Sequence, residues 1–568
     1  MDRQGNRRDY SSAYLRRTYR EAGQVKNETV ANLSSLPGHV VDLIDAGLKG
    51  RQLVRAEEAV AITFSLPHGH VAAVHAMARQ LGLPALLGPA GRARDLVLAL
   101  VISRVVAPAS KLATRTWWED TTLGADLGVA GASTDDIYAA MDWLVSRQDA
   151  IEAGLARRHL GPEPNPSRMA LFGLSSSWLE GRYCSLAARG YSRDGKKGRL
   201  QIEYGLLTDP AGRPVAVRVL PGSTGGPAAF ATIVQVVRET LALEKIVMVG
   251  GRGMITSARI AALNQPADDG TQPPGGSYAW ITALRAPAIR KLMAGDGPLQ
   301  LSLFDEQDLA EVTSDDFPGE RLVACRNPVL AAGRARKRED LLAATEKLLA
   351  PLLARVAAGR LHSAAAIGVE AGKVISKYKT GKHFEVTITD TSLVVARRQE
   401  QIGAEAALDG SCVLRTPVPA QELDAPAVVS AYNNLRYAER GFRSVFHRLE
   451  ERVKARVLIC LLSSYLTWHL REAWAPLTFT DEHPPAPENP VAPARRSPAA
   501  QAKASCQHDA AGRPYCSFRG LLGHLATLTR NQVRFAGAAT TVPLLTDPAP
   551  AQRQTFELFG TPIPLTLK

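Results

Sequence analysis

A glycine-rich turn near the middle of the chain is the first place where residue types and spacing could do chemistry. Gly250, Gly251 and Gly253 follow a short apolar run and precede a helix-like segment. Glycines between a strand and a helix can cradle phosphate groups. A dinucleotide fingerprint needs a third glycine where Thr256 stands, and no Gly-Lys-Ser/Thr follows. The spacing therefore disfavours a nucleotide-binding loop.

The cysteines do not form a recognisable metal or disulfide motif. Six cysteines are spread over 568 residues without a Cys-x-x-Cys pair, whereas zinc ribbons and disulfide frameworks need closer spacing. Cys506, His508 and Cys516 form the only close Cys/His group, and a fourth ligand at the usual spacing is missing. We therefore do not expect a metal at this group.

Clusters of basic residues indicate a polyanionic partner. The chain has 68 Lys and Arg against 55 Asp and Glu, a net charge of +13, which favours nucleic acid as a partner. A second interpretation is a surplus that only aids solubility, with each cluster a solvated helix face. The densest cluster lies within one predicted helix and comprises Arg436, Arg440, Arg443, Arg448, Arg452, Lys454 and Arg456. A smaller one comprises Arg334, Arg336, Lys337 and Arg338.

Hydrophobic periodicity predicts the elements that must position these residues. Apolar residues three and four apart predict helices over 72–83, 94–108 and 133–160, with Ser133 at a helix start. Strand-like runs follow at 169–178, 200–209 and 214–222, with a turn from Asp209 to Gly212 between the second and third. A helix over 227–243 and a strand over 245–251 come next. This order predicts an α/β fold with a mixed sheet. It is also the order of the ribonuclease H-like fold.

The length predicts several domains. Further along we expect one long helix from Val428 to about residue 470, a proline-rich linker over 478–499 and a helical segment over 518–535. The units that we expect are a basic N-terminal region over 1–80 with some strands, a helical domain over 81–165 that is a candidate for DNA binding, the first part of the core over 166–269, an insertion domain over 270–425, a core helix over 426–475, a linker over 476–505 and a helical tail over 506–568.

A series of short runs resembles one known family. In chain order they are PASKLATRTWW (108–118), SSSWLEG (175–181), GYSRDGKKG (190–198), GLLTD (205–209), VGGRGMIT (249–256), SLFDE (302–306), PGERLVACRNP (318–328), KYKTGKHFE (377–385), ALDGSCVLRT (407–416) and NNLRYAERGFRS (433–444). Together they are similar to bacterial insertion-sequence transposases of the DDE class, over about residues 10 to 560. The resemblance implies a ribonuclease H-like core in which two aspartates and a glutamate hold two Mg2+ ions for phosphodiester chemistry.

This chain has glycines at three positions where the family pattern has aspartates. The first catalytic aspartate ends the opening strand of the core, and its place is taken by Gly173. The second belongs to an Asp-Arg-Gly-Met run, and its place is taken by Gly251. A further family aspartate corresponds to Gly226. The resemblance therefore implies a catalytic centre that is impaired at two of its three carboxylates.

The family's glutamate is retained. Tyr432 and Glu439 fit its C-terminal signature, whereas Leu435 and Phe446 stand at the arginine and lysine places of that signature. The family also continues for about ten to twenty residues after the position of Val445, and this chain lacks them. Glu439 is therefore the expected catalytic residue and Mg2+ ligand that survives.

The resemblance implies a DNA transposase, which binds DNA and cuts and transfers strands, with catalysis lost or reduced. The alternative is a non-catalytic DNA-binding remnant or a repressor of transposition. Substitution of the missing aspartates by Asp194, Glu203 or Asp209 is not expected, because each belongs to a run that the family has beside its catalytic acids. Glu180 is not expected either, because it stands seven residues from Gly173, and an odd separation places it on the opposite face of a continued strand. The expected partner is double-stranded DNA, through Arg252, Arg436, Arg440, Arg443, Arg448, Arg452 and Lys454.

Neither a signal peptide nor a membrane span is expected. No apolar run follows Met1, and the longest apolar stretch, over 457–470, is interrupted by serines and shorter than a bilayer requires. We therefore expect a cytoplasmic, nucleoid-associated protein. The sequence leaves a homo-oligomer open.

Overall fold

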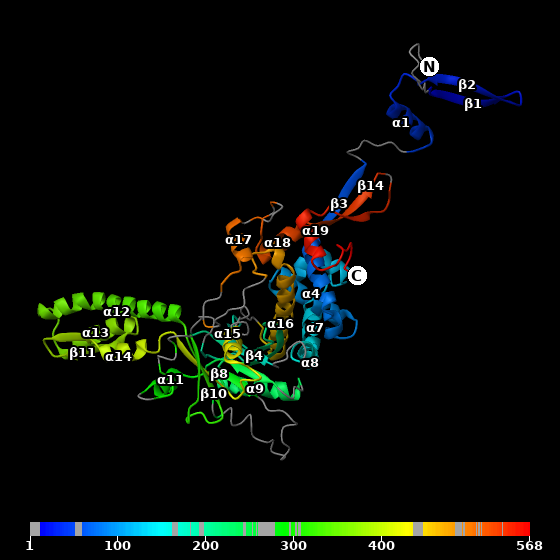
Figure 1. Cartoon of the computed structure of the whole chain (residues 1–568). Helices are drawn as coiled ribbons and strands as arrows, with labels where there is room; N and C mark the ends of the chain where they lie inside the picture. Colours follow the sequence, from blue (N-terminus) through cyan, green and yellow to red (C-terminus); the bar gives the residue numbers. More distant parts are fainter. Residues whose placement is uncertain are drawn as a thin grey trace, which may run out of the picture.

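The computed structural model shows sheets and helices arranged along an extended chain of units (Figure 1). The structure describes residues 12–51, 59–161, 169–181, 183–191, 198–241, 246–252, 254–256, 258, 279–294, 297–300, 304, 308–435, 447–482, 491, 495–506, 508, 512, 514–536 and 538–567. The fold class is α/β, as predicted, because a large mixed sheet carries helices on both faces. Within the described ranges, no single helix combines the length and apolar content needed to cross a bilayer.

The mixed sheet has eight strands in the order β6-β5-β4-β7-β8-β13-β10-β9. Their bounds are β4 (Met169–Trp178), β5 (Gln201–Thr208), β6 (Pro214–Pro221), β7 (Val247–Gly250), β8 (Ala279–Ala283), β9 (Leu309–Val312), β10 (Arg321–Arg326) and β13 (Ser411–Thr416). β7 pairs in parallel with β4 and β8, and the other pairs are antiparallel. The predicted strands before residue 252 are confirmed. The predicted turn from Asp209 to Gly212 is also confirmed, and it needs glycine because the φ of Gly212 is +85°.

Four strands of this sheet come from the expected insertion. β8, β9, β10 and β13 all lie between residues 270 and 425, and they continue the core sheet beyond β7. α11 (Ala286–Met293) packs on the sheet, because its Ile289 and Leu292 share an apolar cluster with residues of β10 and β13. The separate part of the insertion consists of α12 (Pro328–Ala357), α13 (Ala364–Lys377), β11 (Phe384–Ile388), β12 (Leu393–Arg397) and α14 (Gln399–Ala406). Figure 1 shows α12, α13 and β11 projecting away from the sheet. They have a small core of their own.

Two helical layers cover the sheet. On one face, Phe172 of β4 packs against Phe230 of α9 (Gly226–Glu239), with ring centroids 5.8 Å apart. The other face is covered by α15 (Ala425–Asn434), whose Val428 and Val429 pack against β4 and β7. Burial of these apolar side chains stabilises the sheet between the two layers.

A helical unit joins the sheet on the α9 side. It consists of α2 (Gly69–Gln80), α3 (Leu83–Leu87), α4 (Arg92–Val106), α5 (Lys111–Glu119), α6 (Thr122–Asp126), α7 (Thr134–Ser146), α8 (Gln148–His159) and α16 (Glu450–Ala473). The predicted helix start at Ser133 is confirmed as a capping box. The Asp136 amide donates to the Ser133 hydroxyl, and the Asp136 carboxylate accepts from the Ser133 amide.

The helix expected from Val428 to about residue 470 is wrong as one element. α15 ends at Asn434, and α16 begins only at Glu450 after an extended Leu449 with ψ 137°. Apolar periodicity continues across both helices, so it could not reveal the break. The expected proline-rich linker likewise ends in a helix, α17 (Pro498–Cys506).

The C-terminal segment is only partly helical, which corrects the expected helical tail. α18 (Phe518–Ala526) and α19 (Pro550–Glu557) are helices, but β14 (Thr529–Phe535) and β15 (Val542–Leu545) are strands. β14 pairs with β3 (Val60–Pro67), the strand that leads into the helical unit. The His68 and Gly69 amides both donate to the Leu528 carbonyl at 2.9 Å. Gly69 is required here, because a Cβ would lie 2.5 Å from the Leu525 carbonyl oxygen.

The N-terminal arm lies apart from the rest of the molecule (Figure 1). It consists of the hairpin of β1 (Tyr14–Glu21) and β2 (Gln24–Asn32) and of α1 (Gly38–Leu48), and α1 has no buried residue. The strands predicted in the first 80 residues are confirmed by β2 and β3.

Buried histidines in α2 predict a loss of stability in acid. Burial lowers the pKa of His70 and of His75 to about 4 each, with a smaller contribution from His68 to the first and from Arg79 to the second. In the unfolded chain these groups titrate near 6.5, so below that pH the unfolded state binds more protons. Stability is thus complete above pH 6.5 and falls towards pH 4, by about 1.4 kcal/mol per pH unit for each histidine.

We therefore expect a lower melting temperature at pH 5.0 than at pH 7.5, measured by differential scanning calorimetry. His75→Gln should reduce that difference, and the same change at the exposed His362 is the control. A pH dependence that His75→Gln leaves unaltered would contradict the assignment.

Candidate functional site

Gly173 lies within β4, and Gly251 directly follows the end of the adjacent strand β7. β4 and β7 are parallel, and Phe172 is the partner of Gly250. The next step of this register brings Gly173 beside Gly251, and both residues are buried. The two positions to which the family pattern assigns missing aspartates therefore meet at the carboxyl end of β7.

The glycine pair lies on the face of the sheet that α15 covers. Side chains alternate along a strand, so Gly173 shares its face with Leu171. Leu171 and Val249 belong to the same apolar cluster as Val428 and Val429 of α15. The helix that precedes Glu439 in the sequence thus covers the same side of the sheet.

The glycine pair offers no side-chain oxygen to a metal. The Gly251 carbonyl accepts a hydrogen bond from the Met254 amide at 3.0 Å and one from the Thr282 hydroxyl at 3.5 Å. Glu439 lies outside the described residues. In the part of the chain that the structure describes, no three His, Cys, Asp or Glu side chains are grouped to hold a metal. Because Mg2+ requires carboxylate oxygens, the described residues do not fit the expected pair of ions.

Other carboxylates near β4 and β5 do not take the places of the missing aspartates. Glu180 is exposed beyond the end of β4. Glu203 stands on the face opposite to Gly173. Asp209 is held in an ion pair with a neighbouring arginine at 2.6 Å, and burial raises its pKa against the effect of that arginine. Asp194 lies outside the described residues.

Arg252 is directed towards a pair of cysteines. Cys325 and Cys412 are partners on β10 and β13. Hydrogen bonding with Cys325 and, to a smaller extent, the positive charge of Arg252 lower the pKa of Cys412 to about 7, although burial opposes this. Arg252 therefore has an intramolecular partner near the end of β7, in addition to any role in binding DNA.

Among the predicted DNA-binding residues, the arginines around the start of α16 stack on tyrosines. The Arg452 guanidinium lies 3.9 Å from the centroid of the Tyr138 ring, and that of Arg448 lies 5.6 Å from the Tyr183 ring. Cation–π contacts hold both guanidinium groups against the protein. Arg436, Arg440 and Arg443 lie outside the described residues.

Lys454 is neutralised within the chain. Its Nζ lies 2.9 Å from Glu450 and 3.0 Å from Glu451, one turn back on α16. Such pairs are weak and exchange readily for a stronger anionic partner. The structure therefore reduces the expected contribution of Lys454 to a positive surface.

A cluster of cations from three helices was not predicted from the sequence. Arg104 of α4, Lys111 of α5 and Arg456 of α16 line one small cavity together with Cys460. Burial, together with the charges of Arg456 and Arg104, lowers the pKa of Lys111 to about 7. Burial is the largest cause that lowers the pKa of His447 to about 3, and the charges of Lys111 and Arg456 contribute to the same shift. These like charges create a positive potential at the start of α16 that a bound anion would relieve.

The available signal for this cluster was the run PASKLATRTWW, which contains Lys111. That run contributes only to the family resemblance, because nothing in the sequence brings Lys111 near Arg104 and Arg456. Comparison of the chain with models of protein families and with curated proteins finds no match.

Proposed function

We propose that the chain is a DNA-binding protein that descends from insertion-sequence transposases of the DDE class, with a catalytic centre impaired at Gly173 and Gly251. The observation that carries this proposal is the parallel register of β4 and β7. That register brings the two glycine positions together, as a catalytic pair of carboxylates would require.

The order of elements supports a ribonuclease H-like core. β4, β5 and β6 form an antiparallel meander, α9 follows, and β7 then pairs in parallel with β4. This is the succession of three strands, helix and strand that the ribonuclease H-like fold has. α15, which leads towards Glu439, packs on the face of the glycine pair.

The cation cluster supports DNA as the partner. Arg104 and Lys111 line the same cavity at the start of α16, with no ion-pair partner for either among the described residues. A DNA phosphate would bring the negative charge that these groups attract. Its binding would also release counterions, so that affinity falls with rising salt.

The test is a titration of duplex DNA by fluorescence anisotropy between 50 and 200 mM salt, in roughly the range where phosphate contacts change affinity most. We expect log K to fall linearly with log salt. Lys111→Gln with Arg104→Gln should make the slope shallower by about 1.8, which is about 0.9 for each phosphate that is no longer neutralised.

The control for this titration removes two exposed cations elsewhere, Lys373→Gln with Arg553→Gln. This variant should keep the slope of the unaltered protein. Duplex binding that does not depend on salt, or an equal decrease of slope in the control, would overturn the proposal. Thermal unfolding of all variants checks that they are folded.

A further inference from the structure

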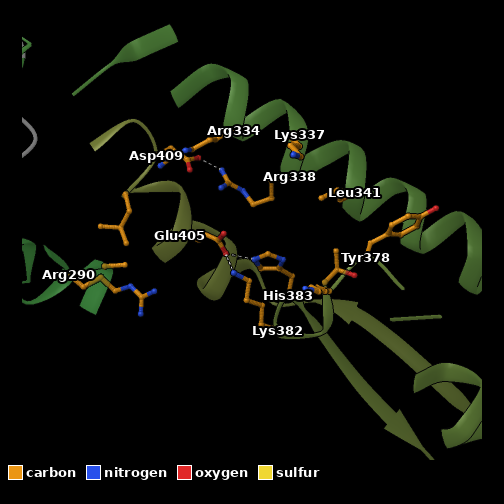
Figure 2. A pocket seen from close by; sticks show the side chains of 14 residues that line it. Arg290, Arg334, Lys337, Arg338, Leu341, Tyr378, Lys382, His383, Glu405 and Asp409 are labelled. Carbon is orange, nitrogen blue, oxygen red and sulfur yellow. Dashed lines mark hydrogen bonds and ion pairs between the residues drawn. The ribbon is translucent and has the colours of Figure 1, made fainter. Parts of the chain in front are cut away.

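A cavity of about 470 Å3 lies in the projecting part of the insertion, away from Gly173 and Gly251. Figure 2 shows side chains from α12 on one side and from the segments around α13 and α14 on the other. The lining residues that carry charge are Arg290, Arg334, Lys337, Arg338, Lys379, Lys382, Glu405 and Asp409. A cavity of this size accommodates a nucleotide-sized ligand.

Both carboxylates of the cavity are already neutralised by side chains that line it. Arg338 contacts Asp409 at 2.5 Å, and their side chains are only 11% and 10% exposed. Lys382 contacts Glu405 at 2.6 Å. Burial opposes the ionisation of Glu405, but the hydrogen bonds from Lys382 and His383 outweigh it and lower its pKa. The acids therefore leave the remaining cations uncompensated.

Four further cations face the cavity without a carboxylate partner among the described residues. They come from three separate parts of the chain and are Arg290 of α11, Arg334 and Lys337 of α12, and Lys379 after α13. Like charges that converge in this way repel each other, and the repulsion is relieved when an anion binds between them. Several cations around one cavity favour a ligand with more than one negative charge.

The turn after α13 contributes both a cation and an aromatic ring. Lys379 has a φ of +57°, a left-handed conformation that a lysine adopts at a cost. Tyr378 is half-buried beside it and also lines the cavity. A tyrosine ring next to cations is an arrangement that stacks a base while the cations hold phosphates.

We propose that this cavity binds phosphate groups of a nucleic-acid strand. The arginines provide paired donors for phosphate oxygens, the lysines provide point charges, and Tyr378 provides a stacking surface. The site is additional to the cation cluster at Arg104 and Lys111. It gives the insertion a role in binding that the proposed function does not include.

The experiment compares two double variants on the same helix. Arg334→Gln with Lys337→Gln removes two cavity cations, whereas Lys347→Gln with Arg355→Gln removes two exposed charges of α12 that do not line the cavity. A labelled twelve-nucleotide single strand is titrated at 100 mM salt with the full chain. We expect the cavity variant to bind at least tenfold more weakly and the control to stay within twofold of the unaltered protein.

Competition identifies the source of the phosphate. Unlabelled strand should displace the label at far lower concentration than a nucleoside monophosphate or inorganic phosphate. If the monophosphate competes as well as the strand, the site takes free nucleotides and the assignment to a strand is overturned. If the control variant loses as much affinity as the cavity variant, the effect is general charge and the cavity has no specific role.

This test is independent of the proposed function. Lys111→Gln with Arg104→Gln leaves the cavity intact, and its effect on duplex affinity is measured separately. A negative result for the cavity with a normal salt slope for the duplex would reject only the cavity. Tyr378→Leu provides a further readout, because it keeps all charges and should weaken strand binding without altering competition by inorganic phosphate.

Discussion

The unaltered chain should leave duplex DNA carrying its cognate ends uncut in the presence of Mg2+, whereas Gly173→Asp combined with Gly251→Asp should nick that DNA at least tenfold above background. The physical reason is the register of β4 and β7, which brings both new carboxylates to one point of the sheet. With two carboxylates from the strands and Glu439 from the sequence that follows α15, the chain would have the oxygen ligands that Mg2+ requires. Conversion of supercoiled plasmid to nicked circles measures the effect.

Three controls accompany this prediction. Each single variant should remain inactive, because it lacks one of the carboxylates that are needed to bind Mg2+. Gly372→Asp with Gly523→Asp introduces the same charge at positions where a Cβ meets no atom within 4 Å, and it should also remain inactive. Glu439→Gln should abolish the activity of the double variant. Appreciable nicking by the unaltered chain would show that our interpretation of the glycines is wrong.

An inactive but folded double variant would have a different meaning. It would point to the residues that the family has after the position of Val445 and that this chain lacks. Salt-dependent DNA binding without any recoverable cleavage would favour the alternative function, a DNA-binding remnant or repressor.

Arg218→Leu should destabilise the protein by about 3–5 kcal/mol, because it leaves a buried carboxylate without its cation. Glu152 of α8 is fully buried and accepts hydrogen bonds from the Val217 amide at 3.0 Å and from Gln148 at 2.9 Å. Arg218 of β6 makes an ion pair with the same carboxylate. These interactions join the helical unit to the edge of the sheet. Urea unfolding at pH 7 measures the decrease in stability.

The pH dependence provides a second readout for this variant. Burial raises the pKa of Glu152, and Arg218 opposes that rise. Without Arg218 the pKa in the folded state rises further above the unfolded value, so the stability of the variant relative to the unaltered chain should recover as the pH falls from 7 towards 5. A deficit that stays constant over this range would contradict the role of the carboxylate.

The control is the other partner of Arg218. Asp149 contacts Arg218 at 3.0 Å, but its side chain is 74% exposed. Asp149→Asn should therefore cost less than about 1 kcal/mol, as exposed ion pairs generally do. Equal decreases for Arg218→Leu and Asp149→Asn would mean that burial of Glu152 does not determine the effect.

Local patterns predicted the elements that depend on neighbouring residues. The strands β4, β5 and β6, the turn at Gly212 and the capping box at Ser133 are all fixed by residues within a few positions of each other. The same reasoning failed over 518–535. There the helix ends at Ala526, because the residues that follow pair with β3. The residues close to this segment in the sequence do not indicate that pairing, since β3 is more than 450 residues away.

In the candidate site, too, only part of the arrangement could be predicted from the sequence. Gly173 lies within β4 and Gly251 directly follows β7, and the sequence predicts both strands, so the approach of the two glycines could be anticipated from the family pattern. The cluster of Arg104, Lys111 and Arg456 could not, because three helices from two ends of the chain meet only in the fold. The continuation of the sheet by β8, β13, β10 and β9 was equally hidden, since no local pattern sets the register between them.

The pairing of β14 with β3 has a consequence for synthesis on the ribosome. The Thr63 hydroxyl donates to the Gln532 carbonyl, across 469 positions of sequence, and His68 contacts the carbonyl of Pro564 at 2.7 Å. β3 and the helices α2 to α8 are translated early, whereas α16 follows only after residue 449 and β14, the partner of β3, only after residue 528. A nascent or prematurely terminated product would present β3 with an open edge and become a substrate for chaperones and proteases. Cells would thus retain mainly copies in which β14 has been translated and is paired with β3.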